Sequence, residues 1–115
     1  KLVNEQRKAG SIAELTYSKN IQECADICVS ELMKNSANID LYNPDYSALL
    51  NEHGIVHKHA KGNIAVGSPD ENTVISILMG SEESKNNILS SDFTDMAVGI
   101  AEKDGTYYWV LLFIG

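Results

Sequence analysis

The stretch FTDMAVGIAEKDGTYYWVLLFI, residues 93–114, decides the fold. Residues 93–101 and 106–114 have the composition of two strands, and Lys103-Asp104-Gly105 between them is a strong hairpin signal. The second strand is apolar at successive positions, so both of its faces must be covered by other elements. The stretch therefore predicts a sheet with a covering layer on each side.

Amphipathic helices that could form these layers are predicted on the N-terminal side of the hairpin. The clearest one follows Ser18, whose hydroxyl suits a helix N-cap, and ends before the polar segment 34–43. Its apolar residues recur at the spacing of one helical face: Ile21, Cys24, Ala25, Cys28, Val29 and Leu32. This pattern predicts a helix that packs on the sheet.

Shorter helices are predicted from their start and stop signals. Residues 2–9 end at Gly10, which suits the left-handed conformation of a helix C-cap. Asn43-Pro44 marks the start of a helix that Gly54 ends. Residues 68–71, Ser-Pro-Asp-Glu, form a capping box, with Ser68 as the expected cap of another helix.

The segment 81–99 has the polar turn, short helix and entering strand that are typical of an active-site region. Glu82 and Glu83, however, occupy the first turn of a helix that Ser81 begins, where the helix dipole favours negative charge. We interpret them as dipole partners in preference to a catalytic carboxylate pair.

Residues 55–67 are expected to be extended, with Ile64 and Val66 on one face. Together these elements predict an α+β protein: a three-layer α-β-α sandwich with a mainly antiparallel central sheet. Because the chain has 115 residues, 43% of them hydrophobic, we expect a single domain over residues 1–115.

The net charge argues against a nucleic-acid partner, and the hydropathy pattern argues against a transmembrane segment. The net charge is −7, and the only near-cluster of basic residues is Arg7-Lys8, whereas nucleic-acid affinity rests on clustered Lys and Arg. The longest apolar run, residues 107–114, is much shorter than the roughly 20 residues that cross a bilayer. We therefore expect no nucleic-acid partner and no transmembrane segment.

Cys24 and Cys28 are four residues apart on the apolar face of one predicted helix. Helix geometry holds their β-carbons about 5–6 Å apart, against roughly 3.8 Å in a disulfide. A redox pair or half of a metal site is the functional alternative. The expected reading is two free thiols that serve as small core side chains.

Five segments resemble, in order, the motifs of the CAP or SCP-like domain, which cysteine-rich secretory proteins, venom antigen 5 and plant pathogenesis-related proteins share. They are LVNEQRKAG at 2–10, LTYSKNIQECA at 15–25, GNIAVG at 62–67, NNILSSDFTDMAVGIA at 86–101 and TYYWVLLFIG at 106–115. The fourth is similar to the bacterial form of the pattern. The resemblance covers essentially the whole chain.

The resemblance implies an α-β-α sandwich, export to the cell surface or medium, and a cavity in which two His and two acidic residues can hold a divalent metal. At the positions that match these ligands the chain has Gly62, Ser84 and, near the first His, Asp40; Asp45 is a possible equivalent of the remaining acid. A transition-metal site needs about three or four N, S or O ligands. We therefore expect no bound metal and no cofactor.

His57 and His59 offer a relocated site, because His-x-His is a real metal-ligand spacing and places both side chains on one face of an extended segment. The alternative is two polar positions on a partly solvated strand near the cavity rim. Only Glu52 lies within a few residues to complete a ligand set or orient an imidazole. Ser84 lacks the G-x-S-x-G context of an activated serine.

The expected function is a non-catalytic, exported binding or interaction module whose unknown ligand outside the cell is a protein, glycan or lipid. A hydrolase or metal-binding enzyme that acts through His57 or His59 with a carboxylate such as Asp40 is the alternative, and lipid or sterol binding, as in some family members, is a third. The candidate cleft residues are Asp40, His57, His59, Asn63, Ser84 and Asn87.

Overall fold

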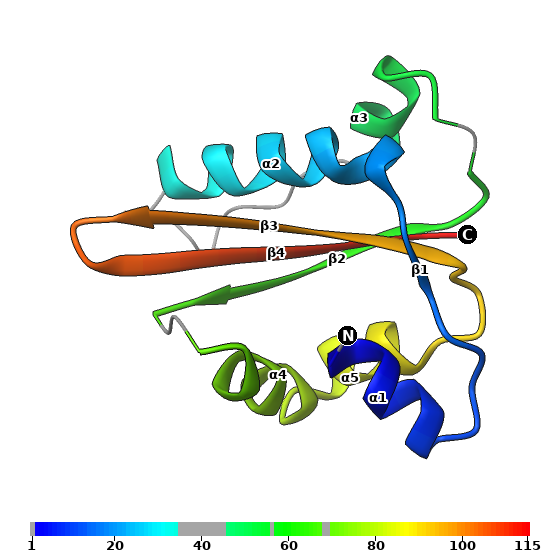
Figure 1. Cartoon of the computed structure of the whole chain (residues 1–115). Coiled ribbons are helices and arrows are strands. Elements are labelled where there is room, and N and C mark those ends of the chain that lie inside the picture. Colours follow the sequence, from blue (N-terminus) through cyan, green and yellow to red (C-terminus); the bar gives the residue numbers. More distant parts are fainter. Residues whose placement is uncertain (1, 35–45, 56, 68–69) are drawn as a thin grey trace.

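The computed structural model describes residues 2–34, 46–55, 57–67 and 70–115. Its helices are α1 (Leu2–Ala9), α2 (Lys19–Lys34), α3 (Tyr46–Glu52), α4 (Glu71–Met79) and α5 (Glu82–Leu89). α2 and α3 lie on one side of a sheet, here called the α2 face, and α1, α4 and α5 lie on the other, the α5 face (Figure 1). The predicted α+β class and its layers of helices are confirmed.

The sheet has four strands in the order β1-β3-β4-β2, and the strands are β1 (Thr16–Tyr17), β2 (Ala60–Val66), β3 (Asp95–Lys103) and β4 (Thr106–Ile114). β3 and β4 form the predicted hairpin, in which Lys103 pairs with Thr106. Asp104 and Gly105 both have positive φ, at 53° and 81°, as a two-residue type I′ turn requires.

The sheet is mixed, and this corrects the prediction of a mainly antiparallel one. β4 is antiparallel to both β3 and β2, but β1 is parallel to β3, with Thr16 opposite Asp95 and Tyr17 opposite Met96. β1 is only two exposed residues long, so it carries no alternating pattern from which its pairing could have been predicted.

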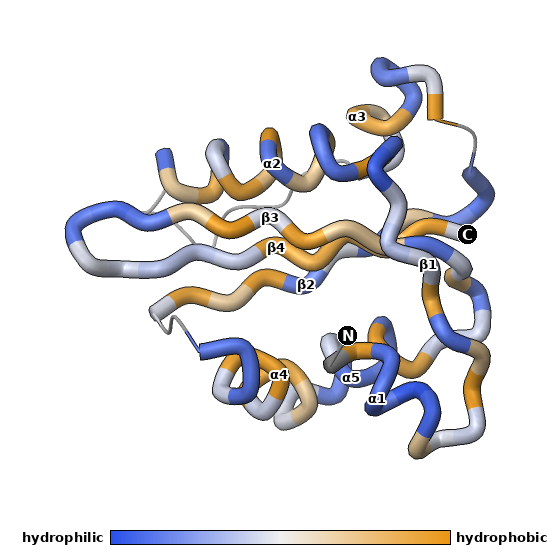
Figure 2. The backbone as a smooth tube through the Cα atoms, viewed as in Figure 1, coloured by the Kyte–Doolittle hydropathy of each residue, from blue (hydrophilic) through white to orange (hydrophobic). Residues whose placement is uncertain are grey.

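β4 is the buried centre of the sandwich, as its apolar sequence predicts. On the α5 face, Trp109, Leu111 and Phe113 belong to one hydrophobic cluster with residues of α4 and α5. On the α2 face, Val110 and Leu112 lie in clusters with the apolar stripe of α2. In Figure 2 the hydrophobic colours follow β3 and β4, whereas the turn between them is hydrophilic. Every residue from Tyr108 to Ile114 is buried.

Two helix ends differ from their predicted chemistry. The left-handed residue after α1 is Ser11, with φ 59°, and not Gly10. The N-cap of α4 is Asp70, whose carboxylate accepts hydrogen bonds from the backbone N–H of Asn72 and the hydroxyl of Thr73. The Thr73 hydrogen bond lowers the pKa of Asp70. The expected cap, Ser68, lies outside the described residues, as does the start signal Asn43-Pro44.

Arg7 is a structural residue and not part of a basic surface. Its side chain is only 1% exposed, and its guanidinium donates hydrogen bonds to the backbone carbonyls of Ala13, Ile88, Ser90 and Phe93. Burial lowers the pKa of this group. The guanidinium of Arg7 therefore links α1 to the end of α5 and to the segment before β3, because its N–H groups donate to carbonyls in each of these places.

No helix in the described parts of the chain is long and apolar enough to cross a lipid bilayer.

Candidate functional site

A cleft of about 460 Å³ lies beside β2, an edge strand of the sheet. Ser47 of α3 lines it together with residues before and within β2 and residues of α5. Its polar lining includes Ser47, Lys58, His59, Lys61, Asn86 and Asn87. Asp92 is a carboxylate among the lining residues. The cleft thus combines amide, hydroxyl and cationic groups in a protein that is acidic overall.

Three of the predicted cleft residues meet in one hydrogen-bonded bridge between β2 and α5. Asn63 is 2% exposed, and its Nδ2 donates to the backbone carbonyl of Ser84 at 3.0 Å. The Nδ2 of Asn87 donates to Asn63 Oδ1 at 2.9 Å. The Asn63 amide therefore has a partner on both its oxygen and its nitrogen, which is how a buried amide is normally satisfied. Ser84 contributes its main chain to this bridge.

Gly62 matches the position of an acidic metal ligand in the family that the sequence resembles. A side chain at this position would lie on the α2 face, next to the Tyr46 ring. A β-carbon added to Gly62 would overlap the ring, with Tyr46 Cε1 only 2.8 Å away. A carboxylate side chain at this position would have to displace the ring before it could reach any ion. Asn63, the next residue, points to the opposite face, as successive strand residues do.

His57 is held by two contacts, neither of which sequence analysis found. Its Nε2 lies 2.8 Å from Ser47 Oγ, and its Nδ1 lies 3.1 Å from the backbone carbonyl of Ile55. A carbonyl can only accept, so Nδ1 carries the proton and Nε2 of the neutral ring is the acceptor for the Ser47 hydroxyl. Both ring nitrogens thus have partners that compete with a metal.

The Gly54 turn places His57 beside Ser47. Gly54 has φ 71° and ends α3 with two backbone bonds, Gly54 N–H to Asn51 and Ile55 N–H to Leu50. This is the Schellman arrangement that reverses the chain at a helix end. The predicted stop at Gly54 is confirmed, but the Ser47–His57 contact depends on the reversal and leaves no motif in the sequence.

His59 is among the residues that line the cleft, and its main chain pairs with Gly115. His59 N–H donates to Gly115 O at 2.9 Å, and Gly115 N–H returns a bond to His59 O at 3.0 Å. The expectation that residues 57–59 belong to an extended strand is wrong, since β2 begins at Ala60. Strand alternation therefore does not apply to the two histidines.

Within the described residues, the candidate metal ligands do not come together as a set that could hold an ion. Among the residues that the structure describes, no group of three or more His, Cys, Asp or Glu is arranged to hold a metal. Asp40 and Asp45 lie outside the described residues, so the expected pairing of His57 or His59 with Asp40 remains a prediction. Ser84 is joined to Asn63 through its main chain, whereas the serine beside a histidine is Ser47.

Cys24 and Cys28 are buried thiols on the α2 face, which confirms the absence of a disulfide between them. Burial raises the pKa of both thiols; nearby Glu23 adds to the effect at Cys24, and Glu31 and Cys24 add to it at Cys28. The pKa of Cys28 is raised to about 12. Such thiols stay protonated at neutral pH, whereas metal binding and redox exchange require the thiolate.

Comparisons with known proteins agree on one family. The model described as "Cysteine-rich secretory protein family", CAP, matches residues 1–113. The uncharacterized protein YkwD of Bacillus subtilis (strain 168) is 30% identical over 117 residues, and the match covers 99% of this chain. The chain spans only 44% of the length of that relative.

Two solved structures share the fold at low sequence identity. An extracellular protein containing a SCP domain, from Bacillus anthracis, has a TM-score of 0.83 at 20% identity, with 98% of this chain and 37% of that chain covered. An outer surface protein from Borrelia burgdorferi has a TM-score of 0.87 at 16% identity, with 98% of this chain and 86% of that chain covered. At such identities the likeness shows the fold alone.

Proposed function

The chain belongs to the CAP family of cysteine-rich secretory proteins, and on this premise we propose that it is an exported interaction module that works without the family's metal. The observation that carries the proposal is the Tyr46 ring in the space next to Gly62. The position that would supply a carboxylate ligand lacks a side chain, and an aromatic ring takes up the room that one would need.

The other candidate ligands support the same conclusion. Ser84, where the resemblance expects a histidine, contributes its backbone carbonyl to the Asn63 bridge. His57 has Ser47 and Ile55 as partners of its two nitrogens. A hydroxyl, a glycine and an engaged imidazole are poor substitutes for the imidazole and carboxylate groups that hold zinc. Recognition at the site would therefore rest on hydrogen bonds and charge.

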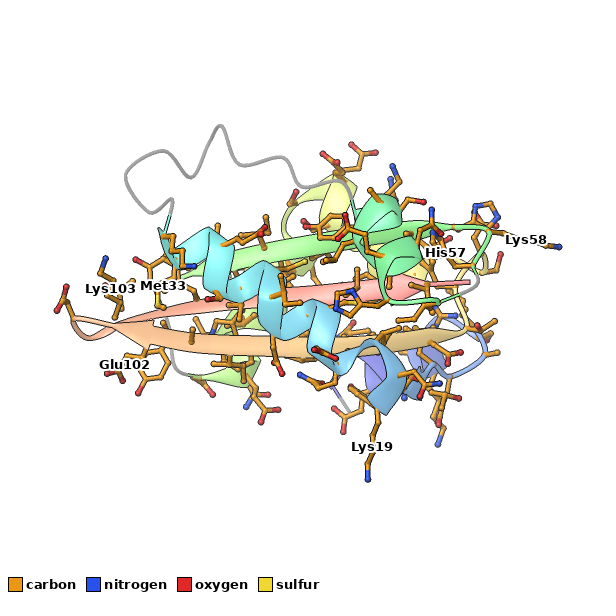
Figure 3. The ribbon with its side chains drawn as sticks, turned by 90° about the horizontal axis from the view of Figure 1, so that it is seen from above. Lys19, Met33, His57, Lys58, Glu102 and Lys103 are labelled. Carbon is orange, nitrogen blue, oxygen red and sulfur yellow. The ribbon has the colours of Figure 1, made fainter. Side chains whose placement is uncertain are left out.

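The cleft beside β2 is the surface that we propose for this recognition. Its amides can donate to and accept from hydroxyl groups, and Lys58 and Lys61 add positive charge. In Figure 3 the Lys58 side chain extends away from the ribbon, where an approaching ligand would meet it first. These groups favour a polar ligand with negative charge, such as an acidic glycan, over an apolar one.

Export is proposed from relatives. The Bacillus anthracis neighbour is described as an extracellular protein and the Borrelia burgdorferi neighbour as an outer surface protein. An extracellular ligand such as a cell-surface glycan is consistent with that location.

Co-sedimentation tests the proposal. The protein is mixed with bacterial cell-wall sacculi that retain their anionic polymers, or with phospholipid vesicles, each with and without EDTA. We expect retention on the sacculi that EDTA leaves unchanged and that Lys61→Glu weakens at least several-fold. Lys8→Glu, at an exposed position of α1, should leave retention intact. Retention that requires divalent metal would contradict the proposal, and retention on vesicles alone would favour the lipid-binding alternative.

A further inference from the structure

We propose that Ser47 and His57 form a nucleophile–base pair that hydrolyses small acyl esters of the polar ligands entering the cleft. This inference goes beyond the proposed recognition role, which requires no reaction. It starts from the 2.8 Å contact between Ser47 Oγ and His57 Nε2. That distance is within the range over which a base takes a proton from an attacking hydroxyl.

The third group of the arrangement is the backbone carbonyl of Ile55. Its oxygen, 3.1 Å from His57 Nδ1, fixes the tautomer in which Nδ1 carries the proton. Nε2 is then the free base that faces Ser47. A nucleophile, a base and a group that orients the base are the three parts of serine-dependent catalysis, whichever residues supply them.

Access and surroundings fit the reaction. Ser47 is exposed and lines the cleft, so an acyl carbon can approach its hydroxyl from solvent, while His57 is partly buried beside α3 (Figure 3). The amides of Asn86 and Asn87 and the ammonium of Lys61 line the same cleft. N–H donors and positive charge are the groups that stabilise the oxyanion of acyl transfer.

The reaction balances with water as the co-reactant. Ser47 Oγ bonds to the acyl carbon while His57 Nε2 takes the hydroxyl proton, and the same imidazole gives that proton to the departing alkoxide, which leaves as an alcohol. Water then attacks the acyl-serine, and His57 accepts a proton from it. The bond from the acyl carbon to Ser47 breaks, the carboxylic acid leaves, and Ser47 regains its proton.

The polar lining sets the expected substrate class. Most residues that line the cleft carry amide, hydroxyl, imidazole or charged groups, and Ala60 and Phe93 add apolar surface on which a short acyl group can rest. The cleft therefore suits a short acyl group, such as acetyl, on a polar carrier.

A fluorophosphonate probe and p-nitrophenyl acetate test the pair on the intact protein. We expect one probe adduct, mapped by mass spectrometry to Ser47, and ester hydrolysis that the same adduct abolishes. Ser47→Ala should remove both signals, and His57→Gln should slow both by about 10²-fold or more, the usual contribution of a general base. Loss of the probe adduct in Ser47→Ala is scored independently of sacculus binding, so failure of this inference and failure of the recognition role are distinguishable.

Two matched variants distinguish catalysis from a structural latch. Glutamine at position 57 can still hydrogen-bond Ser47 but cannot act as the base, so equal labelling rates in His57→Gln and the parent protein would overturn the inference. Ser76→Ala changes an exposed serine of α4, which does not line this cleft, and should leave labelling unaltered. A folded parent protein that does not react with the probe at Ser47 would also overturn it, whatever the variants do.

Discussion

Gly62 and Asn63 are neighbours in β2, yet they lead into two differently built regions. On the α2 face, the Tyr46 ring fills the space beside Gly62, and the contact between them is steric. Beyond Asn63, on the α5 face, two polar side chains and a backbone carbonyl join β2 to α5. The two neighbouring positions thus contribute to the structure in different ways.

The difference teaches how each region should respond to change. The Tyr46 ring can rotate or shift when a side chain is added at position 62, so part of the steric overlap is relieved. A buried amide has no such freedom, because losing one partner leaves another polar group without water or a hydrogen bond. Substitutions on the two faces can therefore be compared directly.

The largest effect is expected from the apolar base of the α5 face. Trp109 is 6% exposed and lies in the cluster beneath the Asn63 bridge. Trp109→Ala should lower the free energy of unfolding by about 3–5 kcal/mol, through lost burial and the cavity that remains. Urea denaturation followed by circular dichroism measures this change. An unaltered midpoint would show that β4 is not the centre of the sandwich.

On the α2 face, two glycines separate rigid from yielding contacts. A β-carbon on Gly99 would overlap the backbone carbonyl of Ala25 in α2, whereas one on Gly62 meets the far end of the Tyr46 side chain. Gly99→Ala should cost about 1–3 kcal/mol, as overpacking usually does. Gly62→Ala should cost less in the same denaturation experiment, and a larger loss there would mean that Tyr46 is fixed in place.

Disrupting the Asn63 bridge is expected to lower the free energy of unfolding about as much as Gly99→Ala does. Asn63→Ala removes the partner of both the Ser84 carbonyl and the Asn87 amide and should cost about 1–3 kcal/mol. Asn86→Ala, on the exposed side of α5, is the matched control and should stay within about 0.5 kcal/mol. Equal free energies of unfolding for the two variants would show that the Asn63 bridge does not stabilise the fold.

A smaller effect is expected from pH on the α2 face. The pKa of Cys28 is raised to about 12 from the ordinary 9.0, so above pH 9 the unfolded chain loses the thiol proton before the folded one does. The stabilising contribution of the buried thiol is complete below pH 9 and is lost as pH rises toward 12. The stability gap between the parent protein and Cys28→Ala should therefore narrow over that interval, and a constant gap would contradict the burial of the thiol.

Much of the fold could be predicted because it depends on repeated local patterns. The hairpin, the apolar stripe of α2 and the stop at Gly54 all follow from residue type and spacing. β1 could not be predicted, because its two residues carry no local pattern and their parallel pairing with β3 depends on the rest of the fold. The structural role of Arg7 could not be predicted either, since its four carbonyl partners are brought together only by folding.

The candidate site was predicted in part for the same reason. Asn63, Ser84 and Asn87 do meet, because β2 and α5 each place them in a regular element. The partner of His57 was missed, since Ser47 is ten residues away in sequence and reaches it through the reversal at Gly54. The ring above Gly62 was equally invisible, because a glycine in a strand does not show what fills the space beside it.

The central claim is that packing and hydrogen bonds have replaced the family's metal ligands, and zinc titration by calorimetry at neutral pH tests it most directly. His57 and His59 without a third ligand should give only weak binding, with a Kd of about 0.1 mM or higher, far from the roughly −8 kcal/mol of a micromolar site. We predict no tight, stoichiometric event. Micromolar binding with one ion per chain would contradict the claim; its loss in His57→Ala or His59→Ala would place the ion at a relocated site, and its survival in both would place it at the family position.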